Sequence, residues 1–226
     1  MHQTITIGLS GNGLSGKDLL FTLLKQQLKI NYGIECKRYS LADELRRELK
    51  NFILEKFGFN IFNCAEAQKT KVRPLLVAYA GIKRKETDGR YWLELLQNQM
   101  KKDGRFGVTD VPTCNIITDI RFAEYGKDEL YWLKNEIKGS LIYVEKYLWD
   151  IDYSTIQQPP ANSEEAKNNP ILKNNADMKF EWNSIGGNMN RVNELSPNVN
   201  NLIDGMFLKN ILPVSFSSQV ESVQNK

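Results

Sequence analysis

The stretch ITIGLSGNGLSGKDLL, residues 5–20, decides the fold that we predict for this chain. It opens with alternating β-branched and small residues, which indicate a short strand, and then becomes rich in glycine. The leucines that follow recur at helical spacing and predict an amphipathic helix over residues 17–30. A strand, a glycine loop and a helix therefore follow one another in this order.

The glycine loop has the composition and the context of a phosphate-binding loop. Glycines let backbone N–H groups converge on phosphate oxygens, the next helix presents its positive N-terminal end, and a lysine adds charge. A tight strand-to-helix turn that binds nothing is the alternative interpretation. The residues that we expect to hold ATP are Gly11, Asn12, Gly13, Leu14, Ser15, Gly16, Lys17 and Asp18.

Asp18 stands where the usual pattern has a Ser or Thr, whose hydroxyl binds the Mg²⁺ that bridges nucleotide phosphates. A carboxylate is also a hard oxygen ligand, so Asp18 is a candidate metal ligand. It is equally a good cap for the N-terminus of the helix, and both interpretations stay open. Because Asp18 would repel a triphosphate, a metal, a Lys or an Arg must lie between them if ATP binds.

Composition narrows the chemistry that the chain can perform. At 226 residues, with 41% hydrophobic and 25% charged residues, we expect one ordinary globular domain. The net charge of +3 is spread along the chain, which disfavours nucleic-acid binding. One histidine excludes histidine-based metal clusters and Ser/His or Cys/His catalysis, and three distant cysteines indicate reduced thiols. We see no targeting or membrane-spanning segment, so we expect no membrane partner and a cytoplasmic location.

Further strands are expected at residues 35–39, 115–118, from residue 141, and at residues 177–182 as an edge strand. Helices are expected from residue 42 and over residues 65–102, the latter broken near Gly81 and Gly89. This alternation predicts an α/β fold with a mainly parallel sheet of about five strands between two helical layers. We expect a single domain, 1–212, with its core at 1–45 and 112–208, a helical insertion at 46–111, and a polar, frayed tail at 213–226.

A second group of polar residues, TDIRF at residues 118–122, follows an apolar strand. Asp119 and Arg121 are therefore expected at the carboxyl end of that strand, where open α/β sheets bind their ligands. Asp119 is a second candidate ligand for Mg²⁺, and the guanidinium of Arg121 suits a phosphate. An ion pair at the surface is the alternative for both residues.

Together these motifs resemble the deoxynucleoside monophosphate kinases of bacteriophages, a branch of the P-loop nucleotide kinase superfamily. The phosphate loop of that family ends in Gly-Lys-Asp, as residues 16–18 do here, and Leu19 departs from it where a Thr is usual. The resemblance covers residues 5–203, nearly the whole chain. The segments that carry it further are SLADELRREL, VRPLLVAYAGIKRKETDGRYWLELL, NIITDIRFAEYGKDELYWLK and NSEEAKNNPILKNNADMKFEWNS.

The resemblance implies a P-loop NTPase-like three-layer fold, a nucleotide-binding helical insertion and phosphoryl transfer from ATP with Mg²⁺. An acceptor monophosphate needs arginine partners, and the candidates are Arg73, Arg84, Arg90 and Arg121. Each arginine could instead be a solvated charge on a helix face. Lys17, Arg121 and Asp43 are the expected catalytic residues, although Asp43 also suits the start of a helix. Trp92 is a candidate for packing on the base, with a core position as the alternative, and Glu164 is expected in a lid over the site.

The predicted function is phosphorylation of deoxynucleoside monophosphates by ATP for DNA synthesis, in the host cytoplasm if the source is viral. Another small-molecule kinase, of the dephospho-coenzyme A or phosphomevalonate type, remains an alternative, as does a nucleotide-dependent switch without catalysis. We find no guanine-reading segment that would favour a switch. The oligomeric state is open, with a homodimer as one candidate.

Overall fold

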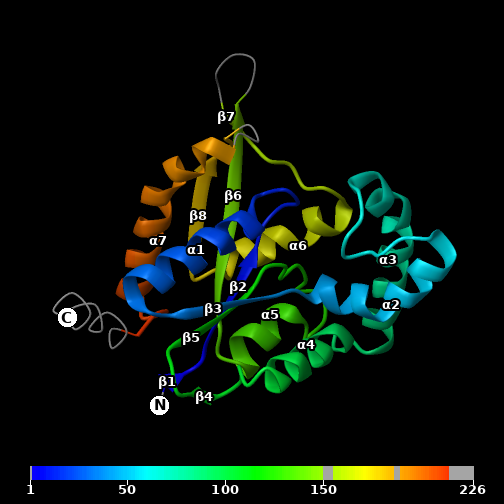
Figure 1. The fold of residues 1–226 in the computed structure, drawn as a ribbon, viewed down its shortest axis with the longest axis horizontal. Helices are drawn as coiled ribbons and strands as arrows, with labels where there is room; N and C mark the ends of the chain where they lie inside the picture. Colours follow the sequence, from blue (N-terminus) through cyan, green and yellow to red (C-terminus); the bar gives the residue numbers. More distant parts are fainter. Residues whose placement is uncertain (1, 150–154, 186–188, 214–226) are drawn as a thin grey trace.

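The computed structural model describes residues 2–149, 155–185 and 189–213, which form a central sheet with helices on both faces (Figure 1). The prediction of an α/β fold with a mainly parallel sheet is thereby confirmed. The strands are β1 (His2–Gln3), β2 (Ile5–Ser10), β3 (Glu35–Tyr39), β4 (Val108–Thr109), β5 (Thr113–Ile117), β6 (Ser140–Trp149), β7 (Thr155–Gln157) and β8 (Met178–Asn183). The helices are α1 (Lys17–Tyr32), α2 (Leu41–Phe57), α3 (Glu66–Glu86), α4 (Tyr91–Lys102), α5 (Glu129–Tyr131), α6 (Ser163–Asn174) and α7 (Ser196–Leu208), with a π-helical turn at Trp132–Glu136 and a 3-10 helix at Met189–Leu195.

The parallel strands lie in the order β3-β5-β2-β6-β8, so the strand that leads into the glycine loop is central. β7 pairs antiparallel with the far end of β6, and β1 and β4 form a separate small ribbon. β8 pairs only with β6 among the described strands, which agrees with the predicted edge strand. Because the strands run in one direction, their carboxyl ends share one edge of the sheet, and the glycine loop lies there.

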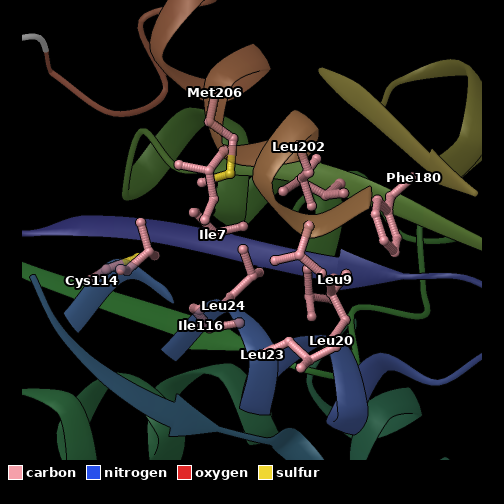
Figure 2. Close-up of a cluster of buried hydrophobic side chains, with 14 of the residues drawn as sticks. Ile7, Leu9, Leu20, Leu23, Leu24, Cys114, Ile116, Phe180, Leu202 and Met206 are labelled. Carbon is pink, nitrogen blue, oxygen red and sulfur yellow. The ribbon is translucent and has the colours of Figure 1, made fainter. Parts of the chain in front are cut away.

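One face of the sheet is covered by α1 and α7 (Figure 2). The leucines of α1 recur every three or four residues, so they form a single apolar stripe that packs on Ile7 and Leu9 of β2. Met206 and Leu202 of α7 belong to the same buried cluster, and Figure 2 draws them in the upper part of the view, with the α1 leucines Leu20, Leu23 and Leu24 in the lower part. These side chains are almost fully buried, which fixes where α1 begins relative to β2.

The other face of β2, β5 and β6 is covered by α4, α5 and the π-helical turn. Leu93 and Leu96 of α4 pack with Ile117 of β5 and with Trp132, which is completely buried. Helix α4 therefore belongs to the layer that covers the sheet, although it lies within the predicted insertion at residues 46–111.

Helices α2 and α3 project from the sheet and are joined by a small apolar cluster of their own (Figure 1). Its buried members are Leu49, Ile53, Phe59, Ile61 and Val72. The predicted break at Gly81 is wrong, because α3 runs through this position to Glu86. A single glycine costs a helix only about 1 kcal/mol, which the packing of so long a helix can offset. The break near Gly89 is confirmed, since α3 ends before it and α4 begins after it.

Two segments of the chain lie partly or almost entirely outside the residues that the structure describes. The segment before residue 175 contains one helix, α6, and residues 150–154 lie outside the described residues. The predicted frayed tail lies outside them as well, except for Pro213. None of the helices in the described parts of the chain is both long and apolar enough to cross a membrane.

Candidate functional site

The glycine loop connects the end of β2 to the first turn of α1. Gly11 has φ 130°, and a Cβ there would lie 2.2 Å from the carbonyl oxygen of Val144. Gly16 has φ 88°, and a Cβ there would lie 2.2 Å from the indole ring of Trp182. Both positions therefore require glycine for backbone conformation and for space. Leu14, at the exposed tip of the loop, adopts a positive φ of 61° without this freedom.

Lys17 folds back into the loop that it follows. Its Nζ donates to the carbonyl oxygens of Gly11 and Asn12, both at 2.8 Å, and to Oγ of Ser15 at 3.2 Å. Burial, followed by the positive charge of Arg121, lowers the pKa of Lys17 from 10.5 to about 8. The structure thus places a buried ammonium inside the predicted phosphate cradle, in an environment that favours the arrival of negative charge.

A carboxylate from α6 reaches the same loop. Glu165 is buried and accepts hydrogen bonds from the backbone N–H of Gly13 at 2.8 Å and of Ala161 at 3.0 Å. Its other oxygen lies 3.1 Å from the guanidinium of Arg121. Glu164, the predicted lid residue, is instead exposed. The lid role of Glu164 stays a prediction, while Glu165 is the residue that contacts the loop, because adjacent positions on a helix point about 100° apart.

The loop is also tied to three segments near the end of the chain. The amide of Asn12 donates to the carbonyl of Gln158 and accepts from Asn169 on α6. The indole of Trp182 on β8 donates to the carbonyl oxygen of Ser15 at 2.8 Å. Because all of these groups are buried or half-buried, the loop is held by contacts that solvent does not readily replace.

Asp18 and Asp43 are joined by an arginine that the sequence analysis did not single out. Arg38, at the carboxyl end of β3, donates Nε to Asp18 at 2.8 Å and a terminal nitrogen to Asp43 at 2.6 Å. Asp43 also accepts from Arg46 at 2.8 Å. Negatively and positively charged side chains therefore alternate in the order Asp18, Arg38, Asp43 and Arg46 beside the glycine loop. The repulsion expected between Asp18 and a triphosphate is reduced by this pairing, since Arg38 neutralises part of its charge.

Asp119 is placed at the predicted edge of the sheet, but its oxygens are engaged. It accepts from Oγ of Ser40 at 2.7 Å and from the N–H groups of Leu41 and Ala42, both at 2.9 Å. A carboxylate here satisfies the free N–H groups that begin helix α2. No group of three or more acidic, Cys or His residues that could hold a metal occurs in the described residues. Metal binding by Asp119 stays a prediction, and the observed role of its side chain is to fix α2.

The loop after β5 carries Arg121 and is supported by two buried acids. Glu129 accepts from the N–H of Arg121 at 2.6 Å and of Phe122 at 3.1 Å. Burial, followed by the charge of Asp128, raises the pKa of Glu129 to about 8. These contacts hold the backbone from which the Arg121 side chain extends toward Glu165.

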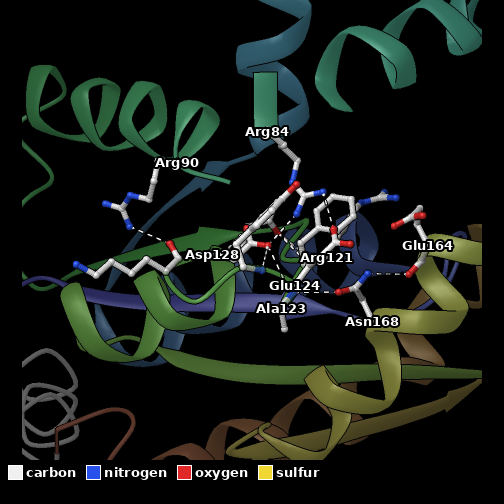
Figure 3. A network of polar contacts seen from close by, with 12 residues as sticks. Arg84, Arg90, Arg121, Ala123, Glu124, Asp128, Glu164 and Asn168 are labelled. Carbon is white, nitrogen blue, oxygen red and sulfur yellow. Dashed lines mark hydrogen bonds and ion pairs between the residues drawn. The ribbon is translucent and has the colours of Figure 1, made fainter. Parts of the chain in front are cut away.

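Arg84 links α3 to this loop, as Figure 3 shows. It is buried, it donates to Asp128 at 2.8 Å, and its guanidinium lies 3.4 Å from the ring centroid of Phe122. Asn168 of α6 adds a second contact by accepting from the N–H of Ala123 at 3.1 Å. The side chain of Arg84 is therefore a cross-link between the projecting helices and the site, with its charge already balanced by Asp128.

The other predicted acceptor residues lie elsewhere. Arg90 makes a two-pronged ion pair with Glu136, at 2.7 and 2.9 Å, and Figure 3 shows Arg90 to the left of Arg84 and Asp128. Arg73 is exposed and pairs with Glu66 of its own helix. Trp92 is only 4% exposed and packs in the core, so it offers no open face to a base, and this prediction is corrected.

The structure thus brings Lys17, Arg121 and the loop together, with Asp18 and Asp43 beside them through Arg38. Sequence reasoning missed Arg38, Glu165 and Trp182. The position of Arg38 at the carboxyl end of a strand is the same signal that identified Arg121, so it could have been found. No sequence pattern indicated that Trp182, which follows the loop by 167 residues, would contact it.

Comparisons with known proteins add little to this geometry. No protein-family model matches the chain, and no curated protein matches it. A solved structure, the crystal structure of TT1252 from Thermus thermophilus, has a TM-score of 0.42 and 12% identity. That similarity covers 92% of this chain and 98% of the other, and it is too weak to carry an argument about fold or function.

Proposed function

We propose that this protein is a P-loop kinase that transfers a phosphate from ATP to a deoxynucleoside monophosphate. The observation that carries the proposal is the buried Lys17 inside a glycine loop at the carboxyl end of the central strand, with Arg121 close enough to lower its pKa. The strand order β3-β5-β2-β6-β8 supports it, because the loop then opens where parallel sheets bind ligands.

Phosphoryl transfer depends on in-line positioning and on positive charge around the transferring group. The N–H groups of the loop and the start of α1 would hold the phosphates of ATP, and Lys17 would neutralise charge as it moves to the leaving oxygen. Arg121 and Arg38 are the arginines best placed for the acceptor phosphate, since each is at the end of a strand beside the loop. Asp43 would orient Arg38.

Mg²⁺ would reduce the charge of the ATP phosphates and would be held mainly by those phosphates and water. Asp18 fits as a single protein ligand, because it is exposed and only its Oδ1 is hydrogen-bonded to Arg38. Asp119 fits less well, since both of its oxygens already accept from the start of α2. The protein's own contribution to the metal site is therefore small.

The test is an ADP-release assay with ATP, Mg²⁺ and a panel of deoxynucleoside monophosphates. We expect stimulation by at least one of them, and replacement of Lys17 by Ala to abolish turnover. Lys25→Ala is the matched control, because Lys25 is an exposed lysine of the same helix. No stimulation by any deoxynucleoside monophosphate would sink the proposal.

Two other outcomes would select the alternatives. Stimulation only by dephospho-coenzyme A or by a phosphomevalonate-type acceptor would indicate a different kinase on the same scaffold. ATP binding without transfer to any acceptor would indicate a nucleotide-dependent switch. Product formation from each candidate acceptor separates these cases, and two acceptors that share one site should slow each other's turnover.

A further inference from the structure

Trp182 is an aromatic residue at the carboxyl end of the edge strand β8, remote in sequence from the glycine loop. It is 4% exposed and packs edge-on against Phe180, with the ring centroids 5.2 Å apart. Both rings belong to the core layer beneath α1 and α7, and Figure 2 shows Phe180 at one end of that layer. The indole is therefore held firmly at the start of α1.

The single polar group of this indole is directed at the loop. Nε1 of Trp182 donates to the carbonyl oxygen of Ser15 at 2.8 Å. A trans peptide bond is planar, so the carbonyl of Ser15 and the N–H of Gly16 point in opposite directions. A hydrogen bond that holds the Ser15 carbonyl toward the indole consequently turns the Gly16 N–H away from it.

The ring also restricts Gly16 sterically. A Cβ at Gly16 would lie 2.2 Å from the indole, and the backbone there has φ 88°. The ring thus covers one side of Gly16, and the glycine leaves the peptide free to adopt the required conformation. Without the indole N–H, the Ser15 carbonyl could rotate inward and present its negative oxygen to the phosphates.

We infer that Trp182 is a positioning residue of the phosphate loop, which keeps the Ser15–Gly16 peptide oriented so that its N–H faces the phosphates of the nucleotide. Trp182 touches neither phosphate nor metal and acts only through the loop backbone. The inference rests on the proposed function to the extent that a polyphosphate occupies the loop. It goes beyond that function by assigning a part in phosphate affinity to a residue of β8.

The test compares Trp182→Phe with Trp132→Phe. Trp132 is a suitable control because it is also buried and its indole also donates one hydrogen bond, to Gln97 at 3.2 Å, in the layer on the other face of the sheet. Affinity for inorganic tripolyphosphate and for ATP is measured by calorimetry, and KM values are measured for ATP and for the acceptor. Both variants lose core packing, so a lower melting temperature alone does not distinguish them.

We expect Trp182→Phe to weaken tripolyphosphate and ATP by about tenfold, as for one lost hydrogen-bonded contact, and to raise KM for ATP without raising KM for the acceptor. Trp132→Phe should leave both affinities within about twofold of the parent. Should Trp182→Phe not fold, benzothienylalanine at position 182 keeps the ring shape and removes only the N–H, and the same loss is expected.

Unchanged tripolyphosphate affinity in Trp182→Phe, or an equal loss in Trp132→Phe, would overturn the inference. Absence of tripolyphosphate binding by the parent chain would overturn it as well. If the affinities follow the expected order but no deoxynucleoside monophosphate is phosphorylated, the proposed function fails and the positioning role of Trp182 stands.

Discussion

Glu129 gives a test of how the loop that carries Arg121 is supported. The carboxyl is buried and its pKa is raised from 4.5 to about 8, first by burial and then by the charge of Asp128. Because the pKa of the folded state is above that of the unfolded state, the protonated carboxyl favours folding. This stability is fully present below about pH 4.5 and is lost as pH rises to about 8.

The magnitude follows from the same values. Each pKa unit corresponds to about 1.4 kcal/mol, so ionisation of Glu129 lowers the free energy of unfolding by about 4 kcal/mol between pH 5 and pH 9. Glu129→Gln retains a carbonyl oxygen that can accept from the N–H groups of Arg121 and Phe122 and removes the ionisable group. We expect this variant to match the parent near pH 5 and to be more stable by several kcal/mol near pH 9.

Urea unfolding of parent and variant at intervals from pH 5 to pH 9 measures this difference. Glu55→Gln, which removes an exposed carboxylate of α2, shows how the assay responds to loss of a surface charge. A stability difference between Glu129→Gln and the parent that changes by less than about 1 kcal/mol over this range would refute the reasoning. In that case Glu129 would be ionised in the folded protein and balanced by Arg84.

Two further variants test contacts around the site. Glu165→Gln should lower KM for ATP by about fivefold or more, because the carboxylate that occupies the Gly13 N–H and Arg121 becomes a neutral, weaker partner. A higher KM would show that Glu165 assists bound ATP instead. Arg84→Met should cost about 3–5 kcal/mol in urea unfolding, because the buried carboxylate of Asp128 loses its cationic partner. Adding Asp128→Asn should restore part of this loss, and strict additivity would contradict the pairing.

The sequence correctly predicted those strands and helices that periodicity over a few neighbouring residues determines. The strand at residues 35–39 and the sequence of strand, glycine loop and α1 follow from periodicity and from the spacing of glycines. The helix break at Gly81 was wrong because propensity is a weak term beside the packing of a long helix. The sequence could not decide whether Trp92 packs in the core or binds a base, because an aromatic residue at helical spacing is compatible with both positions.

The sequence identified those candidate site residues that lie within one continuous motif. It missed residues that reach the site from distant segments of the chain. The loop residues and Arg121 come from motifs that are continuous in sequence. Glu165 differs from Glu164 only in the direction that it faces on α6, which depends on how the helix docks. The oxygens of Asp119 are taken by the start of α2, and only the three-dimensional arrangement shows this. Side-chain contacts between segments that are far apart in the sequence therefore could not be predicted from sequence patterns.

The contacts that hold the glycine loop have a consequence for how the protein becomes competent during synthesis. The loop is made first, yet Glu165 and Trp182 contact it across 152 and 167 residues of chain. At roughly 5–20 residues per second, the ribosome adds these partners about 10–30 seconds after it has added the loop. If Trp182 positions the loop as we infer, a nascent chain that ends before β8 lacks the indole at Gly16, and the loop reaches its full phosphate affinity only once β8 joins the sheet.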